Sequence, residues 1–525
     1  MTISKWMTVG TVLKMMAMQY PNKEGAADKF RRLIFKQWNE RSCRLANALI
    51  ELGVKKGDRF AILAYNCVEW LEIYAAAAKG GQICVPIMFR LAPPEMEYVI
   101  NHAECKALLV QKDFIDTINS IRGKLTKVPK DNFVYWGDDK APTGYQHYES
   151  IVGKASPNEP DVVVDGEDVW TFMYTSGTTG KPKGAVRTHE SFLGQYLLSD
   201  LSMGVRPDDC VMLVMPMCHI NSIFYSFAYT YVSGKCFVYN MVSFDPEDLL
   251  RTIGKEKITF TSLVPTHYIM MLALPEEIKK GIDVSSIRQL LISSAPARRD
   301  TKLAIMNYFK NAELWEAYGS TESGLVTLLR PEEQFKKLGS IGREIWGTDR
   351  IKILDEDGKE SPRGQVGELY SRTPSIFKEY WKDPEKTRSV FRGEWFSAGD
   401  MAYQDEDGYF ILVDRKANMI ITGGENVFPS EVENLLGSHP AIKYVAVIGV
   451  PHEKWGEAVK AVVTLHQGKT VTEKELIDHC RGKIAGYKIP KSFDFIKDEE
   501  MPMTATGKIL HRILREKYGK WSDVK

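Results

Sequence analysis

Apolar positions in the first hundred residues recur at helical spacing in some segments and form short continuous runs in others. Trp38, Leu45 and Leu49 follow the period of one helix, and Gly53 marks its end. The same reading predicts strands at residues 59–65, 83–87 and 107–110 and helices at residues 68–78 and 94–102. Strands that alternate with helices predict a doubly wound α/β layer.

A second stretch with the same alternation follows residue 168. Short β-branched and aromatic runs predict strands at residues 169–174, 210–215, 258–263 and 289–293, and a helix is predicted at residues 300–309. Residues 138–168 separate the two stretches and are rich in Pro, Asp, Gly and Ser. We therefore interpret them as a connector.

The pattern becomes β-rich after residue 339, with short strands predicted at residues 350–354, 367–371 and 408–413. Strands at residues 445–450 and 458–465 and helices at residues 430–436 and 473–484 follow. They are enough for a separate small domain. The sequence therefore predicts an α/β protein with α/β layers, a β-rich stretch and a separate small α+β domain from residue 416 onward.

Composition and charge narrow the class of protein. The chain has 525 residues, too many for one ordinary core, and its 69 Lys and Arg nearly balance its 68 Asp and Glu, which leaves no overall field to attract nucleic acid. The eight cysteines form no CxxC pair or Cys/His ligand spacing, which argues against a zinc site and favours a reducing cytoplasm. No segment reads as a signal peptide or a membrane span. We expect small-molecule partners, no nucleic acid and no transmembrane segment.

Residues 175–184, Thr-Ser-Gly-Thr-Thr-Gly-Lys-Pro-Lys-Gly, directly follow the predicted strand at residues 169–174. Glycines let backbone N–H groups approach a ligand, and the hydroxyls and lysines favour an anion, so the segment predicts a polyphosphate-binding loop. It is not a Walker loop, because two residues separate Gly177 from Gly180 and Pro182 follows Lys181. From composition alone, a flexible surface hairpin is the alternative.

Other short motifs accompany this loop. They are His219, Tyr318-Gly319-Ser320-Thr321-Glu322, Gly399-Asp400, Asp414-Arg415, Gly423-Gly424-Glu425-Asn426 and Gly507-Lys508. Together with the loop they resemble the signature sequences of the AMP-forming acyl-CoA synthetases, in the adenylate-forming superfamily. The resemblance spans nearly the whole chain. It implies a large N-terminal domain at residues 1–414, with α/β layers and a β-rich subdomain, and a small mobile α+β C-terminal domain at residues 415–525 that turns between two orientations. It also implies ATP, Mg²⁺ and coenzyme A as ligands.

The resemblance implies an ATP site built from several of these motifs. Tyr318 would stack on adenine, and the carboxylate of Asp400 would hold the ribose hydroxyls with support from Arg415. Without the resemblance, these residues read as ordinary packing and surface charge. The implied ATP-binding residues are Thr175, Ser176, Gly177, Thr178, Thr179, Gly180, Lys183, Ser294, Ala295, Pro296, Glu316, Ala317, Tyr318, Gly319, Ser320, Thr321, Asp400, Arg415 and Lys508.

Four residues are implied to act directly on the reaction. Glu322 would hold Mg²⁺, which takes one or two carboxylates together with phosphate oxygens, and Thr321 would donate to the α-phosphate. Lys508 would stabilise the charge that develops during adenylation, and His219 would position the acyl carboxylate. The ordinary alternatives are a helix-capping turn for Thr321 and Glu322, a solvated charge for Lys508 and a core residue for His219.

The acyl and coenzyme A sites follow from the same resemblance. The residues implied to line the acyl pocket are Phe192, His219, Ser222, Ser294 and Gly319. The residues implied to line the pantetheine channel are Gly423, Gly424 and Glu425, where two glycines would allow a thiol chain to pass close to the backbone. Near residues 414–417 the family usually carries Asp or Lys where this chain has Ala417, so the chain departs from the family pattern at its hinge.

We predict an ATP-dependent carboxylate:CoA ligase. The carboxylate attacks the α-phosphate to give acyl-AMP and pyrophosphate, and the sulfur of coenzyme A then displaces AMP. The alternatives are an acyl-AMP ligase that loads a carrier protein, a luciferase-like oxygenase, and a nucleotide-binding protein without catalysis. Several loops look closest to the carnitine/crotonobetaine-CoA ligase-like branch, and our hypothesis for the acid is a short to medium or cyclic one. A homodimer is compatible with the resemblance.

A basic, amphipathic segment at residues 508–520 lies near the C-terminus. Its apolar positions at helical spacing predict a helix that docks on its own domain. Contact with a membrane surface is the alternative.

Overall fold

The computed structural model describes residues 6–138, 140–175, 181–293, 297–504 and 508–520. The chain divides into a first compact unit, Met1–Leu338 with Gly342–Arg350 and Ser371–Phe396, and a second, Gly339–Ile341 with Ile351–Tyr370 and Ser397–Lys525. Strands of the β-rich subdomain thus group with the C-terminal residues. The domain boundary at residues 414 and 415 stays a prediction.

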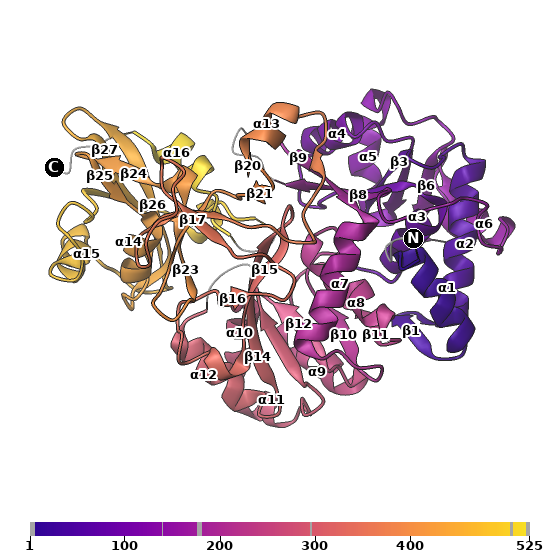
Figure 1. Cartoon of the computed structure of the whole chain (residues 1–525), viewed down its shortest axis with the longest axis horizontal. Coiled ribbons are helices and arrows are strands. Elements are labelled where there is room, and N and C mark those ends of the chain that lie inside the picture. The colour runs from indigo at the N-terminus through magenta and orange to yellow at the C-terminus, as the bar shows by residue number, and fades with distance from the viewer. Residues whose placement is uncertain (1–5, 139, 176–180, 294–296, 505–507, 521–525) are drawn as a thin grey trace. The chain divides into compact units, whose positions relative to one another are not determined.

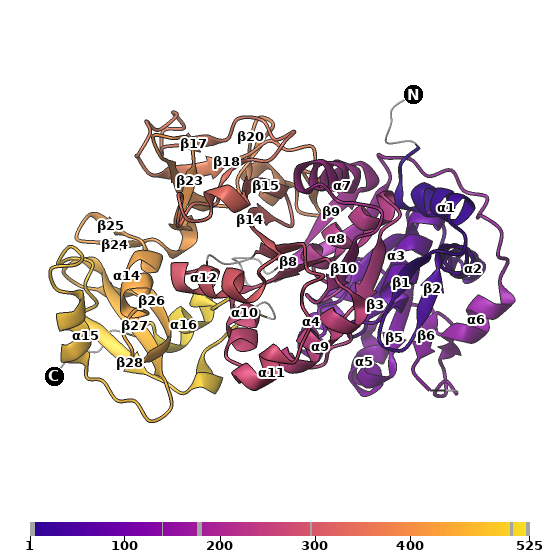
Figure 2. The same ribbon diagram turned by 90° about the horizontal axis from the view of Figure 1, so that it is seen from below.

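Two large sheets frame the first unit (Figures 1 and 2). The strands of one are β3 (Arg59–Leu63), β4 (Ile83–Pro86), β5 (Ala107–Gln111), β6 (Phe133–Trp136), β7 (Gln146–His147), β8 (Val169–Thr175), β9 (Lys183–Thr188) and β19 (Glu379–Tyr380). Their order is β19-β9-β8-β4-β3-β5-β6-β7. The inner strands β3, β4 and β5 are almost wholly apolar and buried, as expected for parallel strands covered on both faces.

The second sheet carries the start of the motif at residues 318–322. Its strands are β1 (Glu24–Ala27), β2 (Arg32–Ile34), β10 (Cys210–Leu213), β11 (Lys235–Val238), β12 (Phe260–Leu263), β13 (Gln289–Ile292), β14 (Glu313–Ser320), β15 (Gly324–Leu329) and β16 (Arg343–Glu344). Their order is β16-β15-β14-β13-β12-β10-β11-β1-β2. Because β10, β12, β13 and β14 are parallel neighbours, their carboxyl ends share one edge of the sheet. Ligands of open α/β sheets bind at such an edge.

Helices cover both faces of each sheet in the first unit. The helices that share one core with both sheets are α1 (Val9–Gln19), α2 (Phe35–Glu51), α3 (Glu69–Gly80), α6 (Tyr148–Lys154), α7 (His189–Met203) and α8 (Ile220–Tyr231). The far face of the first sheet packs against α4 (Pro93–His102) and α5 (Ile115–Ile121). The far face of the second packs against α9 (Pro246–Glu256), α10 (Pro265–Leu272) and α12 (Arg299–Tyr308). The alternation predicted from the sequence is confirmed.

The interpretation of residues 138–168 as a plain connector was wrong in part. They contain β7 and α6, and the side chains of Tyr148 and Val152 on α6 are buried in the core shared by the two sheets. Those two apolar positions, four residues apart, are one turn of a helix. The surrounding Pro, Asp and Gly concealed so short an element.

The second unit is built from sheets that are antiparallel except where its last strand pairs in parallel with its neighbour. The strands of its β-rich part are β17 (Lys352–Leu354), β18 (Gly367–Tyr370), β22 (Asp400–Gln404) and β23 (Phe410–Arg415). The elements of its C-terminal part are β24 (Ile420–Thr422), β25 (Glu425–Val427), β26 (Ile442–His452), β27 (Gly456–Leu465), β28 (Ser492–Phe495), α14 (Pro429–Leu436), α15 (Glu473–Cys480) and α16 (His511–Tyr518). Leu514 on α16 is buried against Ala446 and Ile448, so the prediction that the last helix docks on its own domain is confirmed.

Among the helices of the described residues, none combines the length and the apolar character that a membrane crossing needs.

A buried carboxylate ties the N-terminal segment to the first sheet's helices. Glu72 on α3 is fully buried, and its Oε1 atom accepts hydrogen bonds from Arg31 and Arg41, each at 2.7 Å. Its Oε2 atom accepts from the hydroxyl of Tyr148 at 2.8 Å. A buried charge is tolerated only when it is paired and hydrogen-bonded in this way.

We predict that Glu72→Gln lowers the free energy of unfolding by about 3 kcal/mol, because two guanidinium groups lose their buried carboxylate. Urea denaturation followed by circular dichroism measures the loss. Glu149→Gln is the matched control: Glu149 pairs with Arg41 as well, but its side chain is 47% exposed. For the control we expect about 0.5 kcal/mol. Equal losses in the two variants would contradict the prediction.

Candidate active site

Glu322 lies in the turn between β14 and β15, where the second sheet meets the first. Glu322 is buried, with 8% of its surface exposed to solvent. Its Oε1 atom accepts hydrogen bonds from the hydroxyl of Tyr380 at 2.9 Å and from the hydroxyl of Thr175 at 3.3 Å. Thr175 ends β8 and Tyr380 lies on β19, so hydroxyls of one sheet hold a carboxylate of the other. The structure thus brings together the start of the predicted phosphate loop and the predicted metal ligand.

The predicted phosphate loop is described only at its two ends. Eight predicted ATP-binding residues lie outside the described residues: Ser176, Gly177, Thr178, Thr179, Gly180, Ser294, Ala295 and Pro296. At the ends, Thr175 pairs with Lys183 in the antiparallel β8–β9 ladder. Burial and then Lys386 lower the pKa of Lys183, while Asp383 and Glu322 oppose the shift. The ammonium group of Lys183 therefore lies within electrostatic range of Glu322.

Arg187 on β9 stabilises the turn that contains Thr321 and Glu322. The side chain is completely buried, and its Nη1 atom donates a hydrogen bond to the carbonyl oxygen of Thr321 at 2.6 Å. Burial lowers the pKa of Arg187 to about 10, while Tyr196 and Glu322 oppose the shift. The sequence reasoning missed this residue. A single arginine among the Gly, Ala, Val and Thr that follow Lys183 in this strand is the signal that could have found it.

Gly319 has a steric reason to be glycine. A Cβ atom there would lie 2.1 Å from the carbonyl oxygen of Gly324. The ladder between β14 and β15 shifts register at this point, which brings the two backbones close. Beyond it, the hydroxyls of Ser320 and Ser323 lie 2.9 Å apart and close the turn. A strand follows the motif, so the helix-capping alternative for Thr321 and Glu322 is wrong.

The three residues before Gly319 belong to the last part of β14. The carboxylate of Glu316 is buried and forms an ion pair with Lys302 on α12. Burial raises the pKa of Glu316, and Lys302 opposes the shift. Ala317 is buried and Tyr318 is half-buried. The side chain of Glu316 therefore has a structural partner, and the adenine-binding roles of Glu316, Ala317 and Tyr318 stay predictions.

The candidates for the acyl pocket fall into different environments. His219 caps α8, because its Nδ1 atom accepts a hydrogen bond from the backbone of Asn221 at 3.2 Å. Ser222 is buried, and its hydroxyl donates to the carbonyl of Met215 at 2.6 Å. Phe192 is fully buried, with its ring centroid 4.8 Å from that of Trp170. The structure gives Ser222 and Phe192 packing partners. Their role in acyl binding stays a prediction.

Three candidates come together within the second unit. Asp400 and Arg415 face each other across the β22–β23 ladder, and the Nε atom of Arg415 lies 2.5 Å from Oδ1 of Asp400. Lys508 is exposed, and partial loss of hydration and then Arg415 lower its pKa below the ordinary value of 10.5, with Asp400 opposing. Lys508 is therefore in electrostatic contact with the pair that was predicted to bind ribose.

Gly423 and Gly424 form the turn of the β24–β25 hairpin. Both have positive φ, 60° and 85°, and Thr422 pairs with Glu425 across them. A two-residue hairpin turn with positive φ at both positions favours glycine by itself. The passage of a thiol chain is therefore not needed to explain these glycines. The assignment of Gly423, Gly424 and Glu425 to coenzyme A stays a prediction.

The segment around Ala417 is held by charged and polar neighbours. Ala417 lies in a short 3-10 turn, Lys416–Asn418. The carboxylate of Asp414 accepts hydrogen bonds from the backbone of Ser430 at 2.7 Å and from the side chain of Asn418 at 3.3 Å. A carboxylate thus remains beside the predicted hinge, although position 417 itself carries no charge.

Comparison with known proteins places these motifs in one family. The AMP-binding enzyme family matches residues 13–381, and the C-terminal domain of AMP-binding enzymes matches residues 431–508. The chain belongs to the AMP-binding enzyme family. The matched ranges include every predicted site residue described above except the segment from Asp400 to Glu425.

Individual relatives agree with this membership. Long-chain-fatty-acid–CoA ligase FadD13 of Mycobacterium tuberculosis is 34% identical over 93% of each chain. Feruloyl-CoA synthase of an Amycolatopsis species is 34% identical over 93% of this chain and 94% of its own. The crystal structure of the anthranilate CoA ligase AuaEII with anthranoyl-AMP has a TM-score of 0.88 at 28% identity, over 98% of each chain. The adenylate-forming fold and the family resemblance predicted from the sequence are confirmed.

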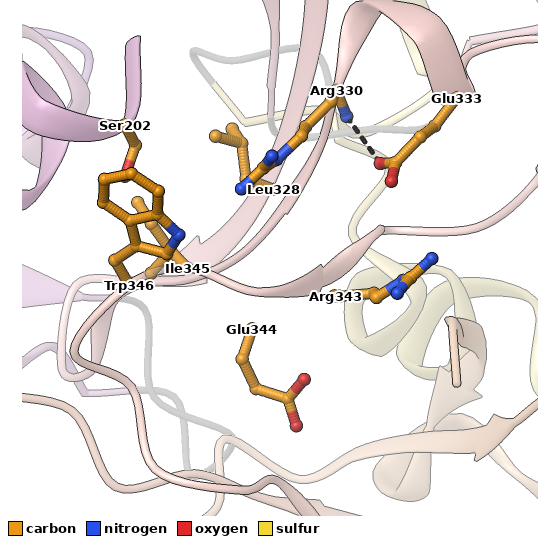
Figure 3. A pocket seen from close by; sticks show the side chains of 8 residues that line it. All are labelled: Ser202, Leu328, Arg330, Glu333, Arg343, Glu344, Ile345 and Trp346. Carbon is orange, nitrogen blue, oxygen red and sulfur yellow. Dashed lines mark hydrogen bonds between the residues drawn. The ribbon is translucent and has the colours of Figure 1, made fainter. Parts of the chain in front are cut away.

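A small pocket in the first unit lies apart from the predicted site of this AMP-binding enzyme. Its lining residues are Ser202, Leu328, Arg330, Glu333, Arg343, Glu344, Ile345 and Trp346 (Figure 3). Its volume of about 200 Å³ is below the roughly 300–1,000 Å³ that is typical of small-molecule sites. None of its residues belongs to the predicted ATP or acyl sites. We assign it no role in the reaction.

We predict that Gly319→Ala slows adenylation by about 100-fold, because the Cβ atom forces the β14–β15 turn open and displaces Glu322 by roughly 1 Å. Pyrophosphate release with saturating substrates measures the rate. Gly153→Ala on α6 is the matched control, since a Cβ atom there meets no heavy atom within 4 Å. A Gly319→Ala protein with full activity would show that the turn tolerates the side chain.

Proposed function

We propose that this AMP-binding enzyme is a carboxylate:CoA ligase that uses ATP and proceeds through an acyl-adenylate. The observation that supports it best is the buried Glu322 carboxylate, held by Thr175 at the mouth of the predicted phosphate loop. The relatives named above are CoA ligases of fatty and aromatic acids, which supports the same reaction type.

The first half-reaction joins two anions, the acid and the α-phosphate, so the site must supply cations and oriented donors. We assign Thr175, Lys183 and the loop between them to the phosphates, and Thr321 to the α-phosphate. Arg187 fixes the backbone at Thr321 and is a positioning residue. His219, at the start of α8, would orient the acid for attack.

Glu322 fits a magnesium ion. Mg²⁺ takes hard oxygen ligands and is often held by one or two carboxylates together with substrate phosphates. Two hydroxyl donors orient the Oε1 atom of Glu322, and a bound ion would offset the charge of the phosphates. Within the described residues, no group of three or more His, Cys, Asp and Glu side chains could hold a metal by itself.

In the second half-reaction the thiol of coenzyme A displaces AMP. We assign residues 415–525 to a C-terminal domain that turns about the segment near Ala417. The Gly423–Gly424 turn then presents backbone without side chains to the pantetheine arm. All eight cysteines are free and buried, which supports the cytoplasmic location expected from the sequence.

A CoA-dependent pyrophosphate release assay with a panel of acids tests the proposal. Release that needs ATP, an acid and coenzyme A supports a ligase. Release that needs a carrier protein in place of coenzyme A would favour the carrier-loading alternative, and light emission or oxygen uptake would favour the oxygenase. The absence of release with every acid and acceptor would overturn the proposal.

We predict that Lys508→Ala slows adenylation by about 100-fold or more and leaves thioester formation from preformed acyl-AMP nearly unchanged, because the ammonium group stabilises charge only in the first step. The two half-reactions are measured separately. Lys517→Ala is the matched control, since Lys517 is an exposed lysine near the same end of the chain. Equal slowing of both half-reactions would contradict the assignment.

The lowered pKa of Lys508 predicts a pH dependence. A lysine stabilises charge only while it is protonated, so adenylation should decline as the pH rises through a pKa below the ordinary 10.5. Lys508→Arg keeps its charge across this range, so its decline should shift to higher pH. The pH profile of the first half-reaction measures both. An alkaline decline at the same pH in both proteins would assign it to another group.

A further inference from the structure

Asn221, two residues after His219, joins the ends of two strands of the second sheet. Its Nδ2 atom donates hydrogen bonds to the hydroxyl oxygens of Ser262 and Ser293, each at 3.0 Å. The two hydroxyl oxygens lie 3.2 Å apart. Ser262 and Ser293 are buried, and Asn221 is half-buried. We call these three residues the Asn221 triad.

The Asn221 triad does not use all of its own hydrogen-bonding groups. The side-chain amide of Asn221 donates both of its N–H groups to the two serines. One serine hydroxyl donates its proton to the other serine. One hydroxyl proton and the Oδ1 atom of Asn221 remain without a hydrogen-bond partner among the described residues. The triad therefore offers one donor and one acceptor side by side.

The triad lies where the acid is expected. Ser262 is near the carboxyl end of β12, and Ser293 directly follows β13. His219 and Asn221 stand at the start of α8, within one turn of each other, and Ser293 precedes the predicted pocket residues 294–296. The carboxyl edge of a parallel sheet is where ligands bind. Ser222, the neighbour predicted from the sequence, has its hydroxyl committed to Met215 instead.

We propose that the Asn221 triad binds a hydroxyl group of the acid, so that the preferred substrate is a hydroxylated carboxylic acid with the hydroxyl a few bonds from the carboxylate. A hydroxyl both donates and accepts, which matches the open donor and acceptor. A plain hydrocarbon acid would bury these polar atoms without partners, which is unfavourable. The inference rests on the proposed ligase function and concerns only its choice of acid.

Matched acid pairs test the proposal. The probes are 4-hydroxybutyrate with butyrate, 5-hydroxyvalerate with valerate, 4-hydroxybenzoate with benzoate, and 4-hydroxycyclohexanecarboxylate with cyclohexanecarboxylate. The readout is kcat/KM for CoA-dependent pyrophosphate release. We expect at least one hydroxylated member to be preferred over its partner by about tenfold or more, because sites that bind a substrate hydroxyl reject analogues without it.

Two independent substitutions assign the preference to the triad. Asn221→Leu and Ser262→Ala should each bring that ratio down to about 1, and a thermal melt checks that each protein is folded. Asn311→Leu is the matched control, because it removes an exposed amide that donates a hydrogen bond to the carbonyl of Ser285, and its ratio should stay unchanged.

The outcomes separate the two proposals. No release with any acid would overturn the ligase function and this inference with it. Release without a preference for any hydroxylated acid would overturn the inference alone. A preference that persists in both triad variants would also overturn it, since the hydroxyl would then be bound elsewhere.

Discussion

The site depends on one buried carboxylate that is shared between two sheets. Glu322 comes from the second sheet, and the hydroxyls of Thr175 and Tyr380 that hold it come from the first. Hydrogen bonds to a charged group contribute about 1.5–3 kcal/mol each, more than neutral ones. Arg187 donates a hydrogen bond to the same turn and supplies a buried positive charge. Thr175, the first residue of the predicted phosphate loop, is thus joined by a hydrogen bond to the turn that carries the predicted metal ligand.

The predicted site residues are divided between the two compact units. The first carries Thr175, Glu322, His219 and the Asn221 triad, at the ends of strands or at the start of α8, where a rigid scaffold sets their positions. The second carries Asp400 and Arg415, which form an ion pair, and Lys508, whose pKa both of them affect. The residues predicted to bind the acid therefore lie in the first unit. Lys508, the lysine predicted to act in adenylation, belongs to the unit that also carries the predicted hinge.

The sequence predicted the fold where periodicity is strong. Strands such as β3, β5 and β13 are short apolar runs between turns, and their positions differ from the prediction by one or two residues. The helix α6 escaped because two buried residues in a polar segment give little periodic signal.

For the site, the motif around Glu322 was readable from its residues, but its neighbours were not. Tyr380, which bonds to Glu322, and Arg187, which bonds to Thr321, lie far from this turn in the sequence and reach it only through the pairing of β9 with β8 and β19. In the same way, an amide shared between the ends of β12 and β13 becomes visible only when the strands lie side by side.

The edge strand β19 has a consequence for biosynthesis. It pairs with β9 through Glu379 and Tyr380, almost two hundred residues later in the chain. A nascent chain on the ribosome therefore carries β9 as an open edge until residue 380 has emerged. Open edges attract other chains. Fragments that stop before β19 lack the strand that covers the edge of β9 and the Tyr380 hydroxyl that bonds to Glu322. We therefore expect them to aggregate rather than to fold as an independent nucleotide-binding module.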